Sequence, residues 1–77
     1  MMTFLSLNDI KPGEKATVSR ITATGPIRRR LMDIGFTKNA HITCVGESPH
    51  RDPRAFLVRG AVIAIRSEDC KNILVYK

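Results

Sequence analysis

The sequence predicts a mainly β fold: a small, closed or nearly closed barrel of about five strands, with one short α-helix between the first and second strands and a short helical turn before the last strand. Short apolar or alternating segments separated by Gly, Pro and Asn are typical of this class. The chain has 77 residues, so we expect residues 1–77 to form a single domain. An open sheet of this size would expose both edges, and closure into a barrel would hide them.

The N-terminal part is expected to contain a helical turn and the first strand. Residues 7–10 form the turn, and the strand follows in KATVSRI, residues 15–21. Alternation places Ala16 and Val18 on one face of this strand. Ile21 is out of step by one residue, so either a β-bulge or the end of the strand is expected there.

The segment TGPIRRRLMDIGF, residues 24–36, carries the strongest helix signals. Thr24 or Gly25 suits the N-cap, and Pro26 suits the first turn because its missing N–H has no partner there. Gly35 follows the last periodic residue, where a C-cap is expected. At about 100° per residue the apolar side chains form one stripe that must face the core. This stripe comprises Ile27, Leu31 and Ile34.

Three consecutive arginines interrupt this apolar helix. Arg28, Arg29 and Met32 point away from the stripe, and Arg30 flanks it. A solvated helix face is the simplest interpretation, and contact with a partner macromolecule is the alternative. Nucleic acid would require aromatic side chains for base stacking. The chain has three phenylalanines, one tyrosine and no tryptophan, so nucleic-acid binding is not expected to be its role.

The C-terminal half is expected to be rich in strands. The second strand lies in AHITCVGES, with Ile42 and Cys44 on one face. The segment RAFLVRGAVIAIR forms a hairpin, because Arg59-Gly60 can supply a two-residue turn between two apolar runs. The remaining elements are a helical turn in SEDCKN, capped by Ser67, and a last strand in ILVYK.

The hairpin has two apolar faces, although a barrel strand needs only one. Cross-strand partners share a face, so the bulkier set should be the core face. The core face carries Phe56, Val58, Ala61, Ile63 and Ile65. The second face carries Ala55, Leu57, Val62 and Ala64. Either the N-terminal FLSL segment covers this second face, or it is an exposed patch that docks a partner or a second copy of the chain.

Charge and motifs indicate a binding protein. The net charge of +6 attracts nucleic acid, acidic lipid headgroups or an acidic protein. Walker A, GxGxxG, HExxH and GxSxG motifs are absent, so we expect no enzyme, no catalytic residue and no cofactor. Cys44 and Cys70 are expected in the core, with no metal site. Direct Fe(II) binding through Cys44, His41 or Cys70 is the alternative. With neither a signal peptide nor a membrane-spanning segment, the chain is expected in the cytoplasm.

The motif GPIRRRLMDIGF, followed by a strand and then VRGAVIAIR, resembles the FeoA family over about residues 7–77. The resemblance implies an SH3-like β-barrel. It also implies an accessory role in bacterial ferrous-iron uptake, with the cytoplasmic part of the FeoB transporter, which includes a GTP-binding domain, as the partner. Two features depart from the family pattern. Lys38-Asn39 stands where Pro-Gly is frequent, and Leu57 and Val62 stand where relatives are often polar.

The sequence therefore predicts a regulatory protein of ferrous-iron uptake that acts by binding FeoB. An RNA-binding small basic β-barrel of a ribosome-associated type is the alternative. Whether the chain stimulates GTP hydrolysis or stabilises the transporter stays open, as does self-association. The candidate partner-binding residues are Arg28, Arg29, Met32, Leu57 and Val62.

Overall fold

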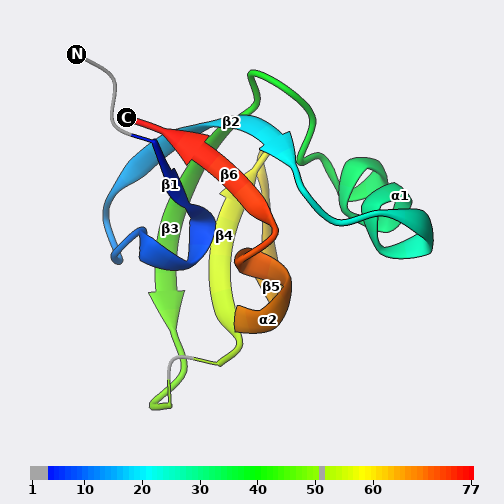
Figure 1. Ribbon diagram of the computed structural model, residues 1–77. Coiled ribbons are helices and arrows are strands. Elements are labelled where there is room, and N and C mark those ends of the chain that lie inside the picture. Colours follow the sequence, from blue (N-terminus) through cyan, green and yellow to red (C-terminus); the bar gives the residue numbers. More distant parts are fainter. Residues whose placement is uncertain (1–3, 51) are drawn as a thin grey trace.

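The computed structural model describes residues 4–50 and 52–77, which form one six-stranded antiparallel sheet curved around a core (Figure 1). The strand order is β1-β6-β2-β3-β4-β5. The strands are β1 (Phe4–Ser6), β2 (Lys15–Ile21), β3 (His41–Glu47), β4 (Arg54–Val58), β5 (Ala61–Ile65) and β6 (Ile73–Tyr76). The helices are the 3-10 turn η1 (Leu7–Asp9), α1 (Gly25–Ile34) and α2 (Ser67–Cys70). The mainly β prediction, with α1 and α2 at their expected places in the order, is confirmed.

The N-terminal segment differs from what the sequence predicts. Residues FLS form the additional strand β1, in which Leu5 lies opposite Val75 of β6. Leu57 and Val62 on the second apolar face of the hairpin are exposed, so the N-terminal segment does not cover this face. The N-terminal segment pairs with β6 and does not cover the hairpin, because the edge of β6 has backbone N–H and C=O groups that an added strand can hydrogen-bond.

The inward faces of the strands build the core, as their alternation predicts. Ala16 and Val18 of β2 are buried, and so are Ile42 and Cys44 of β3. The pairing of β2 with β6 shifts register between Val18 and Arg20, which confirms the bulge interpretation. This bulge returns Ile21 to the buried side of the strand.

Helix α1 begins and ends as predicted but packs by only part of its apolar stripe. Thr24 is the N-cap, and the N–H of Gly35 donates to the carbonyl oxygens of Leu31 and Met32. Leu31 is buried and Ile34 packs partly against the core, whereas Ile27 is 48% exposed. The prediction that Ile27 faces the core is therefore wrong. The helix lies to one side of the barrel (Figure 1), so its first turn has no core to cover.

The β4–β5 hairpin has the predicted register, with Val58 opposite Ala61 and Leu57 opposite Val62. Arg59 and Gly60 both have positive φ, 51° and 80°, as a type I′ turn requires. On the expected core face Phe56, Val58 and Ile65 are buried and Ile63 is partly buried. Ala61 is exposed, contrary to prediction, because it lies on the edge strand β5, whereas its buried partner Val58 lies on β4 inside the sheet. In α2 the N-cap is Arg66 and not the predicted Ser67.

A buried arginine ties the N-terminal turn to the barrel. Among the described residues Arg54 is the only fully buried charged side chain. Its Nη1 donates to the carbonyl oxygens of Leu7 at 3.2 Å and Asn8 at 2.7 Å, and its Nη2 donates to that of Ile10. Its Nε lies 3.4 Å from Oε2 of Glu47, an ion-pair distance without hydrogen-bond geometry. These contacts give the carbonyl groups of Asn8 and Ile10 a donor, add a second donor to the carbonyl of Leu7, which also accepts the N–H of Ile10, and compensate the buried charge.

Candidate partner-binding surface

The two cysteines are part of the core. Cys44 and Cys70 are both fully buried and free. Burial raises the pKa of the Cys70 thiol to about 12, so this thiol is neutral at physiological pH. His41 is exposed on β3, whereas both cysteines are buried. Within residues 4–50 and 52–77, no group of three His, Cys, Asp or Glu side chains lies close enough to hold a metal ion.

The exposed apolar side chains of β3, β4 and β5 form a surface that we call the outer patch. It consists of Val45, Leu57 and Val62, which are 47%, 37% and 66% exposed. Leu57 lies between Thr43 of β3 and Val62 of β5 in the strand register. The two predicted residues of this patch are thus neighbours on an uncovered face. Val45 was not predicted as a candidate; it lies where the register of β3 against β4 shifts, between Cys44 and Gly46.

The predicted candidates on α1 lie elsewhere. Arg28, Arg29 and Met32 are all exposed. Arg28 and Met32 line a small cavity of about 150 Å³ beside the end of β2, together with Phe36. Nη1 of Arg28 donates to the carbonyl oxygen of Ile21 at 3.0 Å, so Arg28 also attaches the helix to β2. The structure does not bring these residues into contact with Leu57 and Val62.

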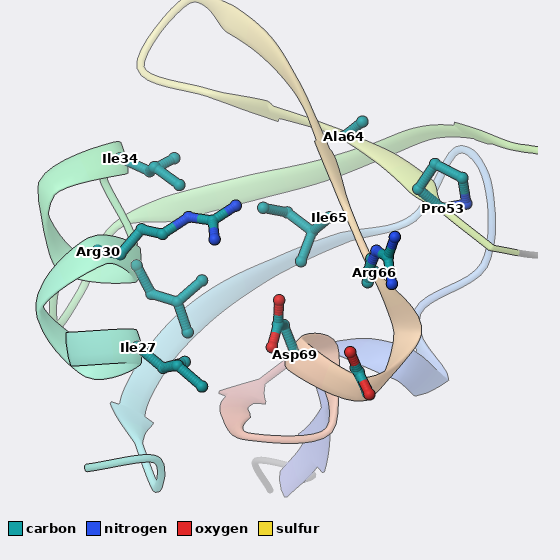
Figure 2. Close-up of a pocket in the computed structure, with 10 residues that line it drawn as sticks. Ile27, Arg30, Ile34, Pro53, Ala64, Ile65, Arg66 and Asp69 are labelled. Carbon is teal, nitrogen blue, oxygen red and sulfur yellow. The ribbon is translucent and has the colours of Figure 1, made fainter. Parts of the chain in front are cut away.

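A groove of about 590 Å³ separates α1 from β5 and α2 (Figure 2). Its apolar lining comes from Ile27, Leu31 and Ile34 of α1, from Ala64 and Ile65 of β5, and from Pro53. The charged residues of its lining are Arg30, Arg66, Glu68 and Asp69. Arg30 extends from α1 into the groove, toward β5 (Figure 2). Sequence reasoning missed this site because it requires the distance between two segments that lie far apart in the chain.

These features define a class of protein. A small antiparallel β-barrel with an exposed apolar patch and a lined groove is typical of a binding or accessory domain. In the described part of the chain, no helix is long and apolar enough to cross a membrane.

The FeoA domain model matches residues 5–77, and the chain belongs to the FeoA family. It is 30% identical over 71 residues to an Fe(2+) transport protein A/Fe(2+) transporter FeoB fusion protein of Porphyromonas gingivalis. The match covers 92% of this chain and 8% of the fusion protein, so the chain spans a small part of that relative.

Solved structures of family members have the same fold. The FeoA-like protein of Clostridium acetobutylicum superposes with a TM-score of 0.88 at 32% identity, over 97% of this chain and 87% of that chain. The FeoA of Stenotrophomonas maltophilia, a prokaryotic SH3 domain protein solved in complex with zinc, has a TM-score of 0.82 at 25% identity, over 92% and 88% of the two chains. The SH3-like prediction is confirmed. The family is one of accessory transport domains and not of enzymes.

Proposed function

We propose that this protein regulates ferrous-iron uptake by binding the cytoplasmic part of a FeoB transporter. The observation that carries the proposal is the fusion relative, in which a segment similar to this chain and a FeoB transporter belong to one polypeptide. Linking two domains in one polypeptide raises their effective concentration for each other, which favours domains that bind one another. Family membership favours this function over the RNA-binding alternative.

The surface of the chain suits a binding role. The outer patch exposes three branched aliphatic side chains, those of Val45, Leu57 and Val62. Burying them against a partner would be favourable, because it removes apolar surface from water. The net charge of +6 favours approach to an acidic protein surface or to the negative inner leaflet of a membrane. A protein of this kind can act without chemistry of its own, because binding one conformation of the transporter better than another shifts its population.

The experiment measures binding of the whole chain to the purified cytoplasmic part of FeoB from the same organism by calorimetry. Leu57→Asp is expected to weaken binding at least tenfold, because it places a charge in the centre of the outer patch, while the circular dichroism spectrum and the unfolding midpoint stay near those of the wild type. Phe4→Asp is the matched control, because Phe4 is also an exposed apolar side chain, 63% exposed, and lies on β1, which β6 and β2 separate from the strands of the patch in the sheet.

Two further variants test the helix candidates. Arg29→Glu and Met32→Asp should each weaken binding if α1 contributes to the same interface. No binding of the wild-type chain to FeoB would overturn the proposal. Unfolding of Leu57→Asp would show that Leu57 is a core residue and would remove the outer patch from the interface.

A further inference from the structure

We propose that the free edge of β5 binds an extended, acidic segment of a partner protein as an additional β-strand, with side chains of that segment entering the groove between α1 and β5. FeoB as the source of the segment rests on the proposed function. The class of ligand rests on the geometry of β5, of the groove and of Arg30.

The outer edge of β5 is unpaired in the described structure. β5 stands at the end of the strand order, and β4 is its one partner there. Natural edge strands are usually protected by charged residues, proline or a bulge. The five residues of β5, AVIAI, have none of these. Such an edge is a template for β-strand addition.

The turn determines which backbone groups face outward. In a type I′ turn the carbonyl of Val58 and the N–H of Ala61 are the hydrogen-bonded ends. Bonded and non-bonded pairs alternate along an antiparallel ladder, so Val62 and Ala64 occupy non-bonded positions opposite Leu57 and Ala55. Val62 and Ala64 therefore direct their N–H and C=O groups away from β4. Both residues are exposed, so an incoming strand can reach these groups.

The groove provides room for side chains beside this edge. Ala64 and Ile65 of β5 form one wall, and Ile27 and Ile34 of α1 form the other (Figure 2). Ile27 is 48% exposed there, which gives a function to a side chain that the core does not use. Side chains alternate along a strand, so every second residue of the added strand would enter the groove and should be apolar.

Charge selects the ligand. Arg30 lies in the groove and makes no hydrogen bond or ion pair with any residue in the described ranges. A carboxylate of the added strand could form a bidentate pair with it. Glu68 and Asp69 line the α2 end of the groove, so the acidic residue belongs at the level of Arg30. A second copy of this chain is disfavoured because it would bring +6 against +6.

Synthetic peptides test this docking mode without FeoB. The probes are eight-residue fluorescein-labelled peptides with valine at every second position, the positions that face the groove, except for one such position near the centre, which is either aspartate or lysine. We expect the aspartate peptide to bind the whole chain at least tenfold more tightly than the lysine peptide by fluorescence anisotropy. The amides of Val62 and Ala64 should shift in NMR spectra and become protected from hydrogen exchange when it binds.

Two variants separate the backbone and charge contributions. Val62→Pro removes one outward N–H without removing a hydrogen bond to β4, so it should lower the affinity for the aspartate peptide at least tenfold. Val62→Thr keeps this N–H and should leave the affinity unchanged. Arg30 is a surface residue, so Arg30→Glu should keep the fold, and it should reverse the preference so that the lysine peptide binds more tightly. This test holds even if Val62→Pro perturbs the fold. Equal binding of both peptides, or unchanged preference in Arg30→Glu, would overturn the inference. Peptide binding without FeoB binding would support the docking mode and refute the proposed partner.

Discussion

The backbone of Gly35 packs directly against the side chain of Val58, which joins the end of α1 to the β4–β5 hairpin. A Cβ placed on Gly35 would lie 2.8 Å from Cγ1 of Val58, and Gly35 has a φ of 131°. Two features therefore require glycine at position 35: the positive φ of the backbone and the close approach of the Val58 side chain. The contact holds the C-terminal end of α1 close to the barrel, while Ile27 in its first turn stays exposed beside the groove.

Gly35→Ala should therefore lower the free energy of unfolding by about 2–4 kcal/mol, combining backbone strain with a clash in the core. Urea denaturation followed by circular dichroism measures the change. Gly13→Ala is the control, because Gly13 also has a positive φ, 91°, but has no atom within 4 Å of the added Cβ. It should show the strain alone. Equal losses in the two variants would contradict the packing of Gly35 on Val58.

Leu31→Ala should lower the free energy of unfolding by about 2–5 kcal/mol, because Leu31 is the one buried side chain of α1 and its truncation leaves a cavity. The same urea measurement applies. Met32→Ala, next in sequence and 39% exposed, should cost less than about 1 kcal/mol. A loss under about 1 kcal/mol for Leu31→Ala would mean that the helix does not pack through this residue.

Arg54→Ala should lower the free energy of unfolding by about 3–5 kcal/mol, since it removes the donor to the carbonyl groups of Asn8 and Ile10 and one of the two donors to that of Leu7. The 3-10 turn should also lose protection from hydrogen exchange before the rest of the sheet does. Arg66→Ala removes an exposed arginine and serves as the control. If both variants were equally stable, the buried contacts of Arg54 would make no net contribution to the free energy of unfolding.

Stability should fall as the pH rises from about 9 toward 12. Burial raises the pKa of Cys70 to about 12 from its ordinary 9.0, so in this range the unfolded thiol ionises while the folded one stays protonated. Its contribution is complete below the lower value and is lost toward the upper one. Cys70→Ala should flatten this pH dependence. Iodoacetamide should label Cys70 slowly in the native chain and rapidly in urea, and fast native labelling would contradict the burial.

Much of the fold could be predicted from local patterns. Alternation in β2, β3 and β4 identified the buried sides of these strands, and Arg59-Gly60 fixed the hairpin register because only that turn joins the two apolar runs so closely. Asn39 adopts a positive φ of 70°, as the tolerance of asparagine for this conformation predicts. The burial of Arg54 could also have been predicted, because strand alternation places Arg54 on the same face of β4 as Phe56 and Val58.

The candidate site was only partly predictable. Leu57 and Val62 follow from the hairpin register, whereas the groove depends on how far α1 stands from β5. Arg28 illustrates the same difference. The helix period places it away from the apolar stripe, but its bond to the carbonyl oxygen of Ile21 arises only when the helix folds against the end of β2.

The sequence by itself determined strands β2 to β6, the turns, the helix and the presence of two apolar faces on the hairpin, because these depend on residues close together in the chain. The tertiary structure alone decided that β1 pairs with β6, that Leu31 is buried while Ile27 is exposed, and that Arg30 lies in a groove next to an unpaired strand edge. Burial and edge pairing are set by segments distant in sequence, and no local pattern records where those segments lie.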